Sequence, residues 1–308
     1  MKNTLVRTVA ACIGVVAISA TTACGAANSD SAPATSVESA RVAEIADSVP
    51  ASISSKGSLA VGAAAYAPAV IAPGSGGQPS GWEVALMNEA AAVMGLTADY
   101  TMIPFDGILT GLEAGRYDAG VGEVAVRAER VERVNFAVNH TTSNVFLAPA
   151  DNTRDEYSSI QDVCGSNIGV MIGTNEAAAA NDIVTECENA GQQGTKVTTF
   201  QDQSTVNLAL SESRIDVDLT SDGQAAYVLQ QTGDKFKIVP LGFGPTIETG
   251  VAFQKTPDGA ALANAYASAI DHLIATGRYQ DIIDEFVEGL GPVEVSKTYT
   301  ETGQLAGQ

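Results

Sequence analysis

Residues 105–144 have the sequence FDGILTGLEAGRYDAGVGEVAVRAERVERVNFAVNHTTSN. Ile108, Leu109 and Leu112 recur at helical spacing, and Gly115 stands where a glycine commonly ends a helix. We therefore expect a helix here, followed by a short strand at 118–121, a turn, a charged helix at 127–134 and a second strand.

Opposite charges flank the turn in this segment, with Glu123 before it and Arg130 after it. Ligands of open α/β sheets lie beyond the carboxyl ends of the strands, so a charged strand-to-helix turn is typical of a small-ligand site. The alternative is a surface helix with charges that only face water, and the charge pattern by itself favours this alternative. That face carries Arg127, Glu129, Arg130, Glu132 and Arg133.

Outside this segment, strand and helix patterns alternate, which predicts an α/β protein. Strands are expected at 59–64, 96–103, 168–171, 197–200, 215–220 and 236–239, and helices at 82–94, 176–188, 204–210, 224–231, 259–275 and 279–286. Extended links at 146–148 and 250–253 join two such series, which predicts two lobes with a hinge. The expected boundaries are 56–147 and 250–290 for lobe 1, 148–249 for lobe 2 and 291–308 for a C-terminal tail.

The N-terminus reads as a targeting segment. Lys2 and Arg7 precede a short apolar run at 9–20, which is too brief to span a membrane stably. Ala23 followed by Cys24 resembles a bacterial lipoprotein cleavage site, so we expect a signal peptide at 1–23 and lipidation of Cys24 on the outer face of the cell membrane. The alternative is an ordinary secretory signal with a chance cysteine. Residues 24–55 are expected to form a flexible tether, because the first part of this segment is rich in small and polar side chains.

Composition excludes several classes of partner. The chain has 308 residues and a net charge of −20, without a Lys/Arg-rich run. This balance argues against nucleic acid and against an anionic lipid surface.

Cysteine and histidine usage gives one expected disulfide and no expected metal site. Cys164 and Cys187 remain once the N-terminal segment is set aside, and an even pair in an exported chain favours a disulfide. The alternative is two unrelated buried thiols. His140 and His272 lie far apart in sequence without metal-ligand spacing, so we expect neither a metal nor a cofactor.

Several ordered motifs between about Val49 and Gly289 together resemble a known family. They are VPASISSKGSLAVG with Tyr66-Ala67-Pro68, GWEVALMNEAAAVMG, FDGIL, LEAGRYD, Glu129-Arg130, DVCGSNIGVMIGTNEA, FQDQSTVNLALSESRIDV and ATGRYQDIIDEF. The chain resembles the solute-binding proteins of bacterial ABC transporters, in the family that carries polar amino acids (type II, family 3). The second-lobe motifs resemble a disulfide-bearing branch found in actinobacteria. The resemblance implies a two-lobed periplasmic-binding-protein (Venus flytrap) fold with a mixed sheet in each lobe.

The resemblance also implies a ligand site. Arg130 stands where the family's arginine grips the ligand carboxylate, and a guanidinium offers the planar two-point fork for that contact. Tyr66 and Phe105 stand where aromatic rings enclose the ligand, although either ring could be plain core. Thr174 and Asn175 stand where second-lobe donors meet the same carboxylate, since a helix start suits an anion; Thr174 as an ordinary helix cap would look the same in sequence.

The chain departs from the family's pattern at this site. Glu123 replaces a small residue, Ala125 replaces a hydroxyl residue, and Ser221, followed by Asp222, replaces the aspartate that holds the ligand's amino group. The aspartate expected shortly before Tyr66 is also missing. A zwitterion needs an anion as well as a cation in a buried pocket, so Glu123 is expected to supply it. The alternative is that Glu123 points outward or pairs with an arginine. A cyclic or methylated zwitterion such as a compatible solute fits these residues as well as an amino acid.

The function implied is binding without catalysis. We expect a monomeric extracytoplasmic lipoprotein that closes on a small zwitterionic carboxylate and delivers it to an ABC permease driven by a separate ATPase, because the chain contains no P-loop pattern. One alternative is a dehydratase-like enzyme on the same fold with Glu123 as general acid, although the chain shows neither a GxSxG elbow nor a Cys–His set. Another is a ligand-sensing partner of a membrane receptor.

Overall fold

A computed structural model describes residues 39–74, 77–286 and 291–305 of the chain. The expected signal peptide at 1–23 and Cys24 lie outside the described residues. Within those residues, every helix is too short or too polar to cross a membrane.

The described chain forms two mixed sheets, one in each lobe. The lobe 1 sheet has the strand order β11-β4-β10-β3-β1-β2, and the lobe 2 sheet has the order β7-β6-β8-β5-β9. Lobe 1 contains β1 (Ser58–Ala63), β2 (Thr97–Met102), β3 (Ala119–Ala125), β4 (Val134–Thr142), β10 (Ile247–Gln254) and β11 (Thr298–Tyr299). Lobe 2 contains β5 (Asn144–Pro149), β6 (Asn167–Met171), β7 (Lys196–Phe200), β8 (Val217–Ser221) and β9 (Phe236–Pro240). The predicted α/β architecture with two lobes is confirmed.

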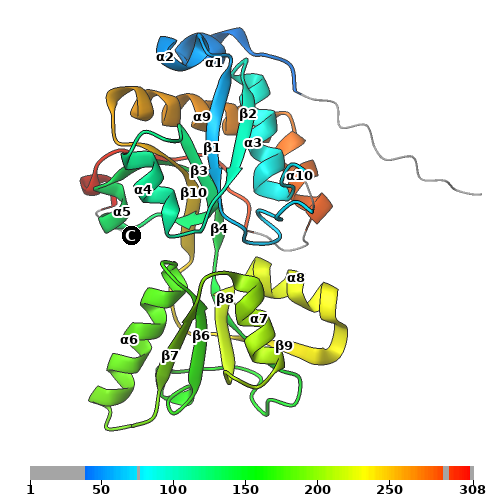
Figure 1. Cartoon of the computed structure of the whole chain (residues 1–308), viewed down its shortest axis with the longest axis vertical. Helices are drawn as coiled ribbons and strands as arrows, with labels where there is room; N and C mark the ends of the chain where they lie inside the picture. The colour runs from blue at the N-terminus through cyan, green and yellow to red at the C-terminus, as the bar shows by residue number, and fades with distance from the viewer. Residues whose placement is uncertain (1–38, 75–76, 287–290, 306–308) are drawn as a thin grey trace, which may run out of the picture. The chain divides into compact units, whose positions relative to one another are not determined.

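Helices accompany each sheet (Figure 1). Lobe 1 carries α1 (Ala43–Ser48), α2 (Ala51–Ser54), α3 (Trp82–Val93), α4 (Gly107–Glu113), α5 (Ala128–Val131), α9 (Pro257–Ala275), α10 (Arg278–Phe286) and the 3₁₀ turn η3 (Thr302–Leu305). Lobe 2 carries α6 (Asn175–Asn189), α7 (Gln203–Ser211), α8 (Asp222–Thr232) and the 3₁₀ turns η1 (Ile160–Asp162) and η2 (Gly233–Lys235).

The longest apolar helices build the core of lobe 1. Trp82, Leu86 and Met87 of α3 are fully buried, and they belong to the same cluster as Tyr266 and Ile270 of α9. α3 is apolar on almost all sides because α9, α10 and the sheet all contact it.

The charged helix predicted at 127–134 is wrong in length. α5 covers only four residues, Ala128–Val131, and Val134 already begins β4. Val131 and Val134 are both fully buried, but β4 pairs with β10 and β11 in the sheet. Sheet pairing of a run rich in β-branched residues thus overrides the helical charge pattern.

The two predicted extended links are full strands inside the sheets. β5 pairs with β8 and β9, and β10 lies between β3 and β4. The first crossover between the lobes is therefore at Ser143, and the second lies between Pro240 and Ile247, instead of the predicted boundaries at 147 and 249. Strands buried on both faces lack polar alternation, which is why short apolar runs look like links in sequence.

Both ends of the described chain belong to lobe 1. Val49 and Ile53, beside and within the short helices α1 and α2, are buried in its core, so the folded part begins before the predicted end of the tether at residue 55. In the predicted C-terminal tail, Thr298 and Tyr299 form β11 on the edge of the sheet.

The predicted disulfide is present. Cys164, just after η1, is bonded to Cys187 near the end of α6, with Cα atoms 5.7 Å apart. It attaches the long helix α6 to the loop that leads into β6.

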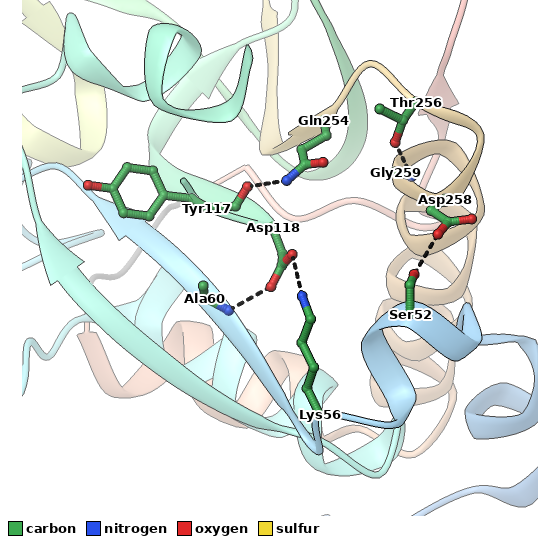
Figure 2. A network of polar contacts seen from close by, with 9 residues as sticks. All are labelled: Ser52, Lys56, Ala60, Tyr117, Asp118, Gln254, Thr256, Asp258 and Gly259. Carbon is green, nitrogen blue, oxygen red and sulfur yellow. Dashed lines mark hydrogen bonds and ion pairs between the residues drawn. The ribbon is translucent and has the colours of Figure 1, made fainter. Parts of the chain in front are cut away.

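A polar network fixes the start of β3 (Figure 2). The Asp118 carboxylate accepts the Ala60 backbone N–H at 3.0 Å and lies 3.5 Å from the Lys56 ammonium. Gln254 of β10 donates to the Tyr117 carbonyl at 2.7 Å. These contacts connect β1, β3 and β10, and so they hold the strand whose other end carries Glu123.

Candidate functional site

A small cavity lies between the lobes. Its volume is about 10 Å³, close to the space of one water molecule. It is lined by Tyr66, Phe105, Gly122, Glu123, Ala125, Thr142, Thr174, Asn175, Glu176, Ile247 and Thr249. Six of the residues predicted from the sequence are in this set. Arg130 lines an adjoining groove that also contacts Phe105 and Thr174, whereas Ser221 and Asp222 are absent from both linings.

The Arg130 guanidinium bridges the lobes. It donates to the Ala125 carbonyl and to the Gly173 carbonyl, both at 2.9 Å, and its carbon lies 5.7 Å from the centre of the Phe105 ring. The residue is only 8% exposed. Burial lowers its pKa to about 10, which leaves it charged at neutral pH. Arg130 therefore presents a buried positive charge beside the cavity.

Tyr66 contacts lobe 2 through its hydroxyl. The Ser221 backbone N–H donates to this oxygen at 3.1 Å, and the Thr220 hydroxyl lies 3.0 Å from it. Because Thr220 also contacts the Gln224 side-chain oxygen, which can only accept, the Tyr66 hydroxyl is the donor to Thr220. The ring of Tyr66 is buried at the cavity, as is that of Phe105.

Glu123 has an unusual backbone conformation. Its φ is 58°, in the left-handed region that non-glycine residues rarely adopt, and Gly122 before it has a φ of 143°. The residue is 9% exposed, and its Oε1 atom has no hydrogen-bond partner among the described residues. Burial is the main cause that raises the pKa of Glu123 well above its usual range, and a hydrogen bond with Ser221 opposes this shift. The outward orientation weighed from the sequence is thus not found in the structure.

Glu83 of α3 holds the Gly122–Glu123 turn, a role that was not expected from the sequence. Its carboxylate accepts the backbone N–H groups of Gly122 at 2.9 Å and of Glu123 at 2.8 Å, and the Asn139 amide at 3.2 Å. The side chain is fully buried, and burial raises its pKa. In the sequence, Glu83 interrupts the apolar run GWEVALM, and a charged residue in such a run indicates a buried side chain with a polar partner.

The start of α6 provides the second-lobe side of the cavity. Thr174 is the N-cap and accepts the Ala177 N–H at 3.1 Å, so the plain capping role weighed from the sequence is present. The Asn175 side-chain oxygen accepts from Arg127 of lobe 1 at 2.8 Å. Glu176, also missed from the sequence, is 9% exposed and lines the cavity. Burial raises the pKa of Glu176.

Ser221 and Asp222 do not line the cavity but make contacts close to it. The Ser221 hydroxyl accepts the Gln224 N–H at 3.2 Å, capping α8, and contacts Glu123. Asp222 accepts the Thr142 hydroxyl at 2.7 Å and the Ser143 N–H at 3.3 Å. Asp222 therefore lies at the first crossover between the lobes.

The charges at the site suit a small charged molecule. A guanidinium and two carboxylates converge on the gap between the lobes with two aromatic rings beside them. Among residues 39–74, 77–286 and 291–305, no group of side chains has the arrangement of a metal site.

The chain is similar to curated amino-acid-binding proteins along most of its length. It is 28% identical over 293 residues to the arginine-binding protein ArgT of Corynebacterium glutamicum, covering 91% of each chain. It is 25% identical over 234 residues to the L-cystine-binding protein TcyJ of Escherichia coli K12, covering 76% of this chain and 84% of that protein.

Solved structures show the same fold. The substrate-binding protein of an amino acid ABC transporter matches with a TM-score of 0.66 at 23% identity, covering 75% of this chain and all of that one. An ancestral arginine-binding protein bound to arginine matches with a TM-score of 0.65 at 24% identity, covering 75% and 98%. The sequence pattern of the bacterial extracellular solute-binding proteins, family 3, matches residues 59–289. With that match over most of its length and this two-lobed fold, the chain belongs to family 3 of the bacterial extracellular solute-binding proteins.

Proposed function

We propose that this protein captures an amino acid or a related zwitterion between its lobes and delivers it to an ABC importer. The observation that carries the proposal is the position of the Arg130 guanidinium in the groove beside the cavity, together with a Glu123 carboxyl oxygen at the cavity that has no hydrogen-bond partner among the described residues. Arg130 is the partner for the ligand carboxylate, and Glu123 is the partner for its ammonium.

Glu123 replaces the second-lobe aspartate that the family resemblance leads us to expect. Ser221 stands at that position, and the Glu123 carboxyl reaches it from lobe 1 through a hydrogen bond. The ligand's amino group would then be held from the opposite lobe. A buried ammonium without a carboxylate is costly, so this exchange keeps the charges of the site balanced.

The names of the relatives support an amino-acid ligand without choosing one. One is named for arginine and another for L-cystine, and they share about a quarter of their residues with this chain. The residues of the site must therefore decide which amino acids bind.

Titration calorimetry with a panel of amino acids, betaines and ectoine-like solutes tests the proposal. We expect micromolar binding of at least one zwitterion, or about −8 kcal/mol. Arg130→Ala should abolish it, because the ligand carboxylate loses its charged partner. Arg214→Ala removes an exposed arginine paired with Glu212 at 2.8 Å and serves as the control. Unchanged affinity in Arg130→Ala would reject the carboxylate site.

We also propose that Cys24 is lipidated and anchors the domain outside the cell. Two features of the sequence support this proposal: a small residue precedes Cys24, and the N-terminus has a positively charged start followed by an apolar run. Metabolic labelling with a fatty-acid analogue should mark the protein and fail to mark Cys24→Ala. Export of the unlabelled native protein into the medium would contradict the anchor.

A dehydratase-like enzyme is the second candidate, because burial favours the protonated form of Glu123 and a protonated carboxyl can act as a general acid. Incubation with prephenate-like acids tests it. Turnover that is lost in Glu123→Gln would support an enzyme, and absence of turnover at high protein concentration would reject one.

A further inference from the structure

The gap between the lobes carries more negative than positive charge. Glu123 from lobe 1 and Glu176 from lobe 2 both line the cavity, each 9% exposed. Neither forms a salt bridge among the described residues. Beside them, Arg130 provides one positive charge, whereas Arg127 is already paired with Glu129 at 2.6 Å.

Both carboxylates lie close to one another and to the Tyr66 ring. The charges of Glu176 and Glu123, after burial itself, raise the pKa of Tyr66, and the charge of Glu176 likewise raises that of Glu123. Glu123 Oε1 is buried at the cavity without a hydrogen-bond partner among the described residues. An unsatisfied buried carboxyl oxygen beside a second carboxylate and two aromatic rings is an environment built for a cation.

A neutral zwitterion does not balance this site. Its carboxylate would be neutralised by Arg130 and its ammonium by Glu123. Glu176 would then keep a hydrogen bond with Thr174 and the attraction of Arg130 and Arg127, whose charges the ligand carboxylate and Glu129 also use. Glu83 and Asp222 contribute further negative charge to the surroundings of Glu123. Without a cation, burial favours the protonated form of Glu176, whereas a ligand with a second positive charge would be stabilised by its ionised form.

We propose that this protein selects cationic amino acids over neutral and acidic ones, with Glu123 and Glu176 as opposed carboxylates that hold the two positive groups of the ligand. The proposal rests on the proposed function and names the substrate class of the same site. Glu176 is then a specificity-determining residue at the start of α6.

L-arginine and L-citrulline form the ligand pair that tests the charge directly, because they differ mainly in a guanidinium against a neutral ureido group. Titration calorimetry of the native protein should show at least about tenfold tighter binding of arginine, which is about 1.4 kcal/mol. Glu176→Gln should reduce the ratio to near one, chiefly through a loss of arginine affinity. Glu186→Gln changes an exposed glutamate of the same helix and should leave the ratio unchanged.

A pH series gives an independent readout. Burial raises the pKa of Glu123 and of Glu176, and a bound cation favours their ionised forms, so arginine should release protons on binding. The charged or titratable groups around the two carboxyls are Tyr66, Glu83, Asp218, Asp222, Arg127 and Arg130. The preference for arginine over citrulline should therefore increase from pH 5 to pH 8, and the arginine enthalpy measured at pH 6 should depend on the ionisation enthalpy of the buffer.

The outcomes separate this inference from the proposed function. Equal affinity for arginine and citrulline, or a preference that stays constant with pH, would overturn the charge selection while leaving amino-acid binding in place. An unchanged ratio in Glu176→Gln, in a variant with native circular dichroism, would overturn the role of Glu176. Failure of every amino acid to bind would instead reject the proposed function.

Discussion

Glu123 departs from the pattern that the family resemblance implies, and its conformation depends on a residue far away in sequence. Its left-handed backbone, with Gly122 before it, directs a carboxyl into the gap between the lobes. Glu83 accepts the N–H groups of both residues and so stabilises that conformation. A buried glutamate far away in sequence thus positions the proposed binding residue.

Asp218 in β8 offers a residue-scale test of buried charge. One of its carboxyl oxygens accepts the Gln203 amide at 2.8 Å, and the other has no partner among the described residues. Burial, the largest cause, raises the pKa of Asp218 to about 8. Its contribution to the unfolding free energy is therefore fully present below the pKa of the unfolded chain and is lost as the pH rises through the folded value.

We expect Asp218→Asn to flatten the pH dependence of stability. In the native protein, the titration of Asp218 lowers the unfolding free energy by up to about 1.4 kcal/mol for each pH unit between the unfolded and folded pKa values. Asparagine does not titrate, so this loss is absent in the variant, and its side-chain oxygen still accepts from Gln203. Urea unfolding should show similar stability of the two proteins near pH 4 and a more stable variant at pH 8.

Asp234→Asn, which changes an exposed carboxylate of the same lobe, is the matched control. It should follow the native protein at every pH. A native-like pH slope in Asp218→Asn would contradict the assignment of a buried, protonated Asp218.

At the scale of elements, tertiary context determined the type of several segments whose sequence pattern was ambiguous. α5 is one turn long because Val134 is taken into β4, and β5 and β10 are central strands although their apolar runs look like linkers. α6, by contrast, follows its sequence closely. It has a threonine N-cap, and its buried residues Ala180, Ile183 and Cys187 lie on one face.

The disulfide should stabilise lobe 2. It joins two cysteines that are 23 residues apart in sequence, one after η1 and one in α6. In the chain-entropy model, closing this loop contributes about 3 kcal/mol to the free energy of unfolding. Cys164→Ser combined with Cys187→Ser should lower the urea midpoint accordingly. Peptide mapping without reduction should show the two cysteines joined in the native protein, and equal stability with and without reductant would contradict the contribution.

At the scale of the molecule, contacts between residues far apart in sequence hold the lobes together. Tyr66 contacts Thr220 and Ser221, Arg130 contacts Gly173, and Arg127 contacts Asn175. All of these residues except Thr220 and Ser221 line the cavity or its adjoining groove. A ligand bound at the proposed site would contact both lobes and would therefore shift the population towards the closed form.

Tyr66→Phe should favour the open form of the protein without ligand. It keeps the ring and removes the hydroxyl that contacts lobe 2, so small-angle scattering should show a larger radius of gyration. Tyr100→Phe removes a hydroxyl that bonds within lobe 1, to Val84 at 3.2 Å and Asn88 at 2.9 Å, and should leave the radius unchanged. Identical scattering of Tyr66→Phe and the native protein would show that this hydroxyl does not hold the lobes closed.

The sequence by itself determined most of the helices and strands, the two-lobed class and the disulfide pair, because apolar period, glycine helix ends and cysteine count are local properties of the chain. It also pointed to Arg130 and Glu123, whose charges stand out beside a turn. Only the tertiary structure placed Glu83 and Glu176 beside them, since both glutamates lie at helix starts where an exposed side chain would look the same. The crossover points and the balance of charge in the gap were also decided by tertiary packing, because they depend on strands and side chains that meet only after both lobes have folded.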